Sequence, residues 1–217
     1  MLKAIVFDMD GTLGDTLPLC VETFARCAEE HTGRRPSEEE ITAFFGVSDR
    51  GILSGLLGIH PDSPELPVAR CVEIYEQLHA QYAPAPFPGA VEILHRLKAK
   101  GLRLALLTGK EAYTALPTLR HFGMQGIFEE KLYGCPTHNC KAERLRELMA
   151  RWELAPEELI YIGDAPSDID QSHRAGVSII CAAWSPNTET DLTDCQDITP
   201  DYRLTSFAEL EPLLDTL

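Results

Sequence analysis

The stretch AIVFDMDGTLGDT, residues 4–16, runs four apolar residues straight into two carboxylates, Asp8 and Asp10. The apolar run predicts a buried strand at about residues 3–8. Acids spaced two apart are expected to point the same way, where their charges repel. Such a pair is tolerated when a divalent cation lies between the two groups, or when one carboxyl keeps its proton. The stretch therefore predicts a chemical site at the end of a buried strand.

Strand and helix patterns alternate along most of the remaining chain. Strands are expected at 102–108, near 128–133, at 159–164 and at 177–183, and helices at 90–100, to about 121, at 141–152, to 175 and at 206–215. Nearly continuous apolar strands separated by helices are typical of a parallel sheet covered on both faces. We therefore predict an α/β fold whose core is a Rossmann-like parallel sheet.

A purely helical block interrupts this alternation after the first strand. Helices are expected at 18–31, from the capping box of Ser37 and Glu40 to near Gly46, at 49–57 and at 65–82. The segment APAPFPGA, residues 83–90, then reads as a stiff connector because it holds three prolines and a glycine. We predict a core domain of residues 1–14 and 87–217, and an inserted helical cap domain of residues 15–86.

Composition limits the partners of the protein. The net charge of −15 and the lack of a basic stripe argue against nucleic acid and anionic membranes as partners. No apolar run approaches the roughly 18 residues that a membrane span needs. Seven cysteines without a regular framework favour reduced thiols. We expect a cytoplasmic monomer or homodimer that binds neither nucleic acid nor membrane.

Polar residues follow three of the predicted strands. Asp8 and Asp10 follow the first, the run Thr108-Gly109-Lys110 follows the second, and Asp164 follows LIYIG. Each of these residues alone is explained as a cap or turn residue, and an isolated Lys141 as a solvated side chain. Ligands of open parallel sheets bind at the carboxyl ends of the strands. The conjunction of these residues therefore predicts one site at that edge.

Phosphoryl transfer through an aspartyl-phosphate accounts for this set of residues. It requires one carboxylate as nucleophile and a carboxylic acid that protonates the leaving group. Mg²⁺ takes a few protein oxygens and several waters, and Asp8, Asp164 and a main-chain carbonyl near Asp10 are the oxygens expected to supply that shell. The hydroxyl of Thr108 and the amine of Lys141 suit the phosphoryl oxygens, where charge gathers.

DMDGT (8–12), a threonine after the next core strand, a later lysine and GDAPSD (163–168) resemble the four motifs of the haloacid dehalogenase superfamily. The chain is similar to its phosphoglycolate-phosphatase-like and β-phosphoglucomutase-like group, which carries a helical cap. The resemblance implies a Mg²⁺-dependent phosphatase that acts on a small phosphorylated metabolite. The roles it implies are a nucleophile (Asp8), a general acid/base (Asp10), phosphate-binding residues (Thr108, Gly109, Lys141), metal ligands (Asp8, Asp10, Asp164), and a residue that supports the metal or orients the lysine (Asp168).

The chain departs from the group's pattern at several positions. Gly109 stands where the group usually has Asn, and Ala142 follows the lysine where Pro is common. The segment CPTHNCK, residues 135–141, fits no common zinc spacing, and the role of Cys135, His138 and Cys140 stays open. Arg50, which follows the GVSD sequence of the cap, is a candidate for substrate specificity.

Rival activities within the superfamily can be compared on single residues. Asp10 argues against dehalogenation, because the dehalogenases lack the second aspartate. The cap, residues 15–86, has five arginines and no lysine, which argues against a Schiff-base hydrolase. A catalytically silent phosphate-binding protein would be expected to lack one of the charged groups. A β-phosphoglucomutase remains the alternative, although its cap histidine is replaced here by Cys20. Phosphoglycolate, a sugar phosphate, a nucleoside monophosphate and pyrophosphate all remain open as substrates.

Overall fold

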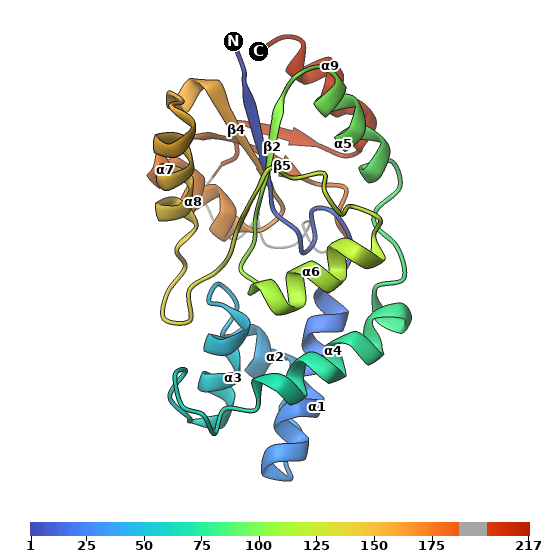
Figure 1. Ribbon diagram of the computed structural model, residues 1–217, viewed down its shortest axis with the longest axis vertical. Helices are drawn as coiled ribbons and strands as arrows, with labels where there is room; N and C mark the ends of the chain where they lie inside the picture. Colours follow the sequence, from blue (N-terminus) through green and yellow to red (C-terminus); the bar gives the residue numbers. More distant parts are fainter. Residues whose placement is uncertain (187–198) are drawn as a thin grey trace.

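The computed structural model of the protein describes residues 1–186 and 199–217. Within them, six parallel strands form one sheet in the order β3-β2-β1-β4-β5-β6 (Figure 1). The strands are β1 (Ala4–Phe7), β2 (Arg103–Leu107), β3 (Glu130–Leu132), β4 (Leu159–Gly163), β5 (Ser178–Ala182) and β6 (Tyr202–Leu204). The predicted α/β class with a parallel sheet is confirmed.

Strand β1 lies at the centre of the sheet, between β2 and β4. Phe7 pairs in register with Leu106 of β2 and with Ile162 of β4. The amide of Asp8 continues this ladder by donating to the carbonyl of Ile162 at 2.8 Å. The residues that follow the three strands therefore reach the same edge of the sheet, at the point where the chain order reverses. Open parallel sheets bind their ligands at such a point.

Helices cover both faces of the sheet (Figure 1). On one face, Ile5 and Phe7 pack in a core with residues of α5 (Ala90–Ala99), α6 (Ala112–His121) and α9 (Leu210–Leu214). On the other face, Ala4 and Val6 pack with residues of α7 (Lys141–Trp152) and α8 (Pro166–Ala175). The alternation within β1 follows from the two-residue period of a strand. Both sets of side chains are fully buried, which explains the continuous apolar run.

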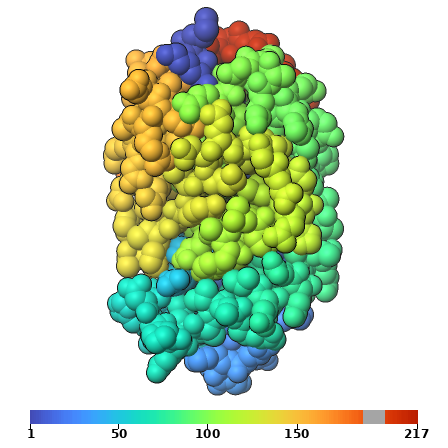
Figure 2. All heavy atoms as spheres, in the orientation of Figure 1, coloured from blue at the N-terminus to red at the C-terminus, as the bar shows by residue number. Residues whose placement is uncertain are grey.

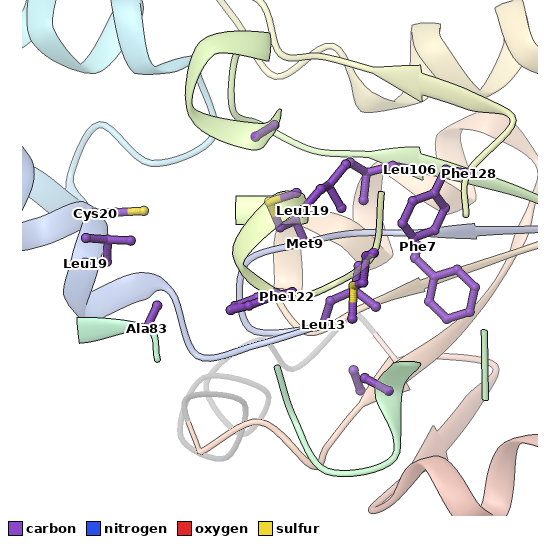
Figure 3. Packing of buried hydrophobic residues seen from close by; sticks show 14 of the residues in the cluster. Phe7, Met9, Leu13, Leu19, Cys20, Ala83, Leu106, Leu119, Phe122 and Phe128 are labelled. Carbon is purple, nitrogen blue, oxygen red and sulfur yellow. The ribbon is translucent and has the colours of Figure 1, made fainter. Parts of the chain in front are cut away.

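The larger core extends past the end of β1 into the turn that carries the acids. In Figure 3, Met9 and Leu13 lie among Leu119, Phe122 and Leu106, while the rings of Phe7 and Phe128 are neighbours with centroids 6.3 Å apart. Met9 and Leu13 are fully buried. Met9, between the two acids, and Leu13, after them, thus anchor the turn in the core.

The regular elements within residues 17–82 are helices, and these lie beyond the carboxyl edge of the sheet (Figure 1). Their atoms form the lower end of the molecule in Figure 2. The helices are α1 (Leu17–Thr32), α2 (Glu38–Thr42), α3 (Asp49–Leu57) and α4 (Val68–Tyr82). We call them the cap helices. The amide of Phe87, in the proline-rich connector, donates to the carbonyl of Leu13 at 2.9 Å and so ties the connector to the first turn. The division of the chain into two folding domains stays a prediction.

Several element ends differ from the sequence prediction. Helix α2 starts with the predicted capping box of Ser37 and Glu40 but stops at Thr42 rather than near Gly46. The amides of Phe44 and Phe45 donate to the carbonyls of Ile41 and Thr42, three residues back, so the chain tightens into turns there. The C-terminal helix is split into a 3-10 turn, Phe207–Glu209, and α9. The sequence did not predict β6, whose three residues carry too short a pattern.

In the described part of the chain, no helix is long and apolar enough to cross a membrane.

Candidate active site

The turn after β1 depends on a glycine that lies against another strand end. Gly11 has φ of +73°, a conformation that glycine adopts without strain. Its amide donates to the carbonyl of Gly14 at 3.0 Å, and the amide of Leu13 donates to Met9 at 2.9 Å. A Cβ atom on Gly11 would lie only 2.0 Å from Oδ2 of Asp164. The missing side chain therefore lets the first motif and the β4 end approach closely.

Asp8, the predicted nucleophile, has one oxygen bound and one oxygen without a partner. Its Oδ2 lies 3.0 Å from Nζ of Lys141, whereas Oδ1 is buried with no hydrogen-bond partner. Burial raises the pKa of Asp8 to about 7; Lys141 opposes this, and Asp168 and Asp10 add to it. A buried, unpaired carboxylate oxygen is costly. This orphaned atom therefore points to a ligand.

Lys141, at the start of α7, connects Asp8 with Asp168. Its Nζ lies 2.6 Å from Oδ1 of Asp168, which also accepts a hydrogen bond from the hydroxyl of Tyr161 at 3.0 Å. The other oxygen of Asp168 accepts from the amide of Ala165 at 3.1 Å. Burial alone would lower the pKa of Lys141, but the charges of Asp168 and Asp8 raise it well above its usual value. Asp168 thus holds the lysine charged and aimed at Asp8.

Asp164 completes a cluster of buried carboxylates. Oxygens of Asp8, Asp164 and Asp168 lie within 4.8 Å of one another. The hydroxyl of Thr12 donates to Asp164 at 3.2 Å, but burial, Asp168 and Asp8 raise the pKa of Asp164 well above its usual value. Three acids that share one lysine carry excess negative charge in a dry site. This set of oxygen donors therefore fits a hard divalent cation.

The side chain of Asp10 turns away from this cluster. It accepts a hydrogen bond from the hydroxyl of Thr16, and its Oδ1 lies 3.3 Å from Nζ of Lys110. The repulsion expected between Asp8 and Asp10 is reduced because each carboxylate pairs with a different lysine, Asp8 with Lys141 and Asp10 with Lys110. The side chain of Asp10 lies outside the carboxylate cluster, which Asp8, Asp164 and Asp168 form; the predicted role of Asp10 as a metal ligand stays a prediction.

Lys110 belongs to the polar run that the sequence analysis placed at this edge, but it was given no role there. Only 3% of the residue is exposed, and its Nζ lies 2.9 Å from Sγ of Cys20 and 4.7 Å from the ring centre of Tyr75. Burial would lower its pKa, but Asp10 and Cys20 lead the groups that raise it well above the usual value. Its position two residues after the strand-end threonine was the available signal. The partners come from α1 and α4, which no local pattern reveals.

The remaining predicted residues lie at different depths. Thr108 is fully buried, and its hydroxyl oxygen accepts from the amide of Lys110 at 3.2 Å. Gly109 lines the main cavity. Arg50 does not: its Nε lies 3.7 Å from Glu111, it donates to the carbonyl of Pro61 at 3.4 Å, and it lines a separate hollow of about 400 Å³. The structure therefore does not bring Arg50 to the other candidates.

One cavity of about 810 Å³ joins the sheet edge to the cap helices. Its core-side lining includes Asp8, Asp10, Gly109, Lys110, Lys141 and Asp164, and its cap-side lining includes Leu17, Val21, Glu22, Phe24, Glu38, Phe45, Val47, Asp49 and Ile52. This volume suits a small metabolite.

The first turn of α3 fixes the cap to the core. The buried carboxylate of Asp49 accepts hydrogen bonds from the amide of Glu111 at 2.9 Å and from the hydroxyl of Thr114. Ser48 donates through its hydroxyl to Glu111 at 2.7 Å. From α4, Tyr75 and Thr118 share a hydroxyl hydrogen bond of 2.6 Å. These contacts hold the cap helices against the core.

A sequence model of the haloacid dehalogenase-like hydrolases matches residues 5–182. The chain belongs to this family. It is 32% identical over 205 residues to a phosphoglycolate phosphatase of Thiobacillus denitrificans, covering 88% of this chain and 89% of the relative. It is 30% identical over 184 residues to a phosphorylated carbohydrates phosphatase of Thermotoga maritima, covering 82% and 84%.

A solved structure supports the same fold. The crystal structure of CbbY from Rhodobacter sphaeroides in complex with phosphate superposes with a TM-score of 0.78 at 22% identity, covering 97% of this chain and 96% of that one. The haloacid dehalogenase-like membership expected from the four motifs is confirmed, and so is the class of enzyme, a phosphatase.

We expect Gly11→Ala to lower the turnover of this hydrolase by about a hundredfold, since displacing a catalytic group by an ångström costs that much. The reason is the 2.0 Å approach of the new Cβ to Asp164. The matched control is Gly33→Ala, which has φ of +74° and nothing within 4 Å, so it should cost only about 1 kcal/mol of stability. Turnover and thermal unfolding are measured for both. Equal turnover in the two variants would contradict the close approach.

Proposed function

We propose that this hydrolase is a Mg²⁺-dependent phosphatase that cleaves a small phosphate monoester through an aspartyl-phosphate on Asp8. The observation that carries the proposal is the Asp8 carboxylate, which pairs with Lys141 through one oxygen and leaves Oδ1 buried without a partner. A buried carboxylate oxygen without a partner is a poised nucleophile, because it has no hydrogen bond to break before it attacks phosphorus.

The reaction follows from the placement of the side chains. Asp8 attacks phosphorus, an O–P bond forms, and the ester O–P bond breaks. Asp10, in the same cavity, gives a proton to the departing oxygen. Asp10 then takes a proton from the water that attacks phosphorus. The water O–P bond forms, the Asp8 O–P bond breaks and inorganic phosphate leaves, so Asp10 holds the proton that it gives in the next cycle. Lys141 balances the charge that gathers on the phosphoryl oxygens during both steps.

Asp8, Asp164 and the main-chain carbonyl of Asp10 are the proposed ligands of Mg²⁺. When bound, the ion would supply positive charge that reduces the repulsion between the incoming phosphate and the carboxylates. Asp168 is proposed to orient Lys141, since both of its oxygens already have partners.

We expect Asp8→Asn to abolish turnover, because an amide is not a nucleophile, and Asp10→Asn to lose about 10²- to 10⁴-fold. Acid quenching of wild-type enzyme during turnover, followed by mass spectrometry, should find phosphate on Asp8. Asp10→Asn should accumulate more of this adduct than wild type, because it lacks the base that activates water for hydrolysis. Activity close to wild type in Asp8→Asn would exclude the covalent route.

Removal of divalent cations is expected to stop turnover, because three buried carboxylates sharing one lysine otherwise repel the anionic substrate. Dialysis against chelator, then titration with Mg²⁺ or with Na⁺ at matched ionic strength, separates a specific ion from screening. Thermal unfolding before and after dialysis controls for loss of fold. Full turnover after complete removal would rule out the metal.

From the charges around the cavity we infer that the part of the substrate beyond its phosphate group is uncharged. Among the described residues, the only cations that line it are Lys110 and Lys141, and both are paired with acids. The cap side adds Glu22, Glu38 and Asp49. Glu22 is balanced by Arg26 and Arg35, at 2.5 and 2.6 Å. A second anionic group, such as the carboxylate of phosphoglycolate, would still meet Glu38 and Asp49. A phosphorylated sugar or alcohol would instead place hydroxyls beside them.

The mutase alternative requires that the aspartyl-phosphate survive in water. The cap histidine of that group is replaced by Cys20, whose thiol lies beside Lys110 rather than forming an imidazole's hydrogen bonds. Nothing among the described residues near Asp10 takes that place. We therefore favour hydrolysis.

The substrate proposal predicts a higher kcat/KM for sugar phosphates and glycerol phosphate than for phosphoglycolate, by about tenfold, which corresponds to about 1.4 kcal/mol. An aryl phosphate serves as the reference, and free phosphate and isomerised sugar phosphate are quantified together. A preference for phosphoglycolate would contradict the charge argument. Isomerisation faster than phosphate release would instead establish the mutase.

A further inference from the structure

A thiol, an imidazole and a carboxylate form a connected row outside the phosphatase site. In the loop between β3 and α7, Sγ of Cys135 lies 3.4 Å from Nδ1 of His138. On the far side of the same ring, Nε2 lies 3.1 Å from Oε1 of Glu143, in the first turn of α7. The hydroxyl of Thr137 lies 3.3 Å from the sulfur and 3.1 Å from Nδ1. The phosphatase mechanism uses none of these groups.

The order of the groups fixes the proton on the ring. An ionised carboxylate only accepts hydrogen bonds, so Nε2 of His138 carries the proton that Glu143 accepts. Nδ1 is then bare in the neutral ring and faces the thiol of Cys135, from which it can take a proton. The carboxylate stabilises the imidazolium that results. This is the arrangement of a base, oriented by an acid, beside a nucleophile.

The surroundings of Cys135 favour its ionised form. Partial burial opposes ionisation, but hydrogen bonds from the side chain and amide of Thr137 and from the amide of His138, with the charge of the imidazole, lower the pKa of the thiol. His138 and Glu143 are 50% and 59% exposed. A partly exposed thiolate is the reactive form of cysteine.

The other described cysteines are placed differently. Cys20, Cys27, Cys71, Cys140 and Cys181 are all buried, whereas Cys135 is the half-buried one among the described residues. Burial raises the pKa of the Cys20 thiol to about 12 and that of Cys181 to about 11. Cys195 lies outside the described residues. Within the described part of the chain, Cys135 is therefore the thiol that a small reagent reaches in its reactive form.

Cys135 also lies where the cap rests on the core. Its carbonyl accepts a hydrogen bond from the amide of Ser48 at 2.8 Å. The carbonyl of Pro136 packs so closely on α3 that a Cβ atom on Gly51 would come within 2.3 Å of it. An added group on the sulfur enlarges a residue at this contact. The contact between this loop and α3 is therefore sensitive to the oxidation state of Cys135.

We propose that Cys135, His138 and Glu143 form a second reactive site, at which a hydroperoxide oxidises Cys135. This oxidation slows the phosphatase because it disturbs the contact between the Cys135 loop and α3. The thiolate attacks the terminal peroxide oxygen, an S–O bond forms and the O–O bond breaks. Cys135 is oxidised to sulfenic acid, and the peroxide is reduced to the alcohol or to water. The leaving oxygen takes the proton that His138 received from the thiol.

The first test measures where and how fast the full-length protein is oxidised. Protein at neutral pH is treated with hydrogen peroxide in the presence of a sulfenic-acid trap, and peptide mass spectrometry quantifies each cysteine, which separates Cys135 from Cys195. Cys135 should be labelled first. His138→Ala should slow its labelling by roughly tenfold, the loss in thiolate for one unit of pKa, and Glu143→Gln should slow it less.

The matched control is Glu147→Gln, one turn further along the exposed side of α7, where Glu147 pairs with Arg144 at 2.9 Å. It should leave labelling unchanged. Thermal unfolding checks that each variant is folded. Equal labelling rates in wild type and His138→Ala, or first labelling of another cysteine, would overturn the site.

The second test measures phosphatase turnover on an aryl phosphate after the same oxidation. Wild type should lose activity in step with labelling of Cys135 and regain it with a thiol reductant. Cys135→Ser should keep its activity throughout. Full activity of the labelled wild type would overturn the link to the cap. An inactive untreated Cys135→Ser that is folded would show a structural need for the thiol and would likewise overturn it. The labelling result stands apart from the identity of the substrate.

Discussion

The ion pairs of Lys141 are the interaction on which the site depends. Asp8, Asp164 and Asp168 are crowded at one sheet edge and almost fully buried. Without a cation, such a cluster would take up protons or open to water. Lys141 contacts two of the three acids, at 3.0 and 2.6 Å, so its removal takes the positive charge away from two buried carboxyls. Breaking a buried pair on one side typically costs about 3–5 kcal/mol. The same charge serves the fold and the chemistry.

A second lysine separates the duties of the two acids in the first motif. Asp10 is paired with Lys110 and accepts from Thr16, whereas Asp8 keeps one oxygen unpaired. Both acids come from a stretch of three residues, yet the partner of Asp8 starts α7, whereas the partners of Asp10 follow β2 and precede α1. Distinct surroundings give neighbouring carboxyls distinct roles, which is how one type of group serves as nucleophile and as acid.

The parts that could be predicted are those set by local pattern. The apolar strands follow from continuous burial, and their register brings Asp8, Thr108 and Asp164 to one edge. Lys110 and Asp49 could not be assigned, because their partners depend on how the cap docks, and this is a long-range contact. Arg50 was chosen because it follows a loop of the cap. Each residue along a helix turns by about 100° around its axis, so a shift of one position is enough to place the side chain on another face.

The cap controls the charge beside the general acid as well as access to the cavity. Nζ of Lys110 contacts Cys20 of α1 and the ring of Tyr75 of α4, so both helices shield this ion pair from water. If α1 and α4 move away, water reaches Lys110 and weakens its attraction for Asp10, because the interaction falls as the effective dielectric rises. Docking of the cap therefore strengthens the pairing of Asp10 at the same time as it encloses the substrate. The position of the acid and the closure of the cavity are linked through one buried lysine.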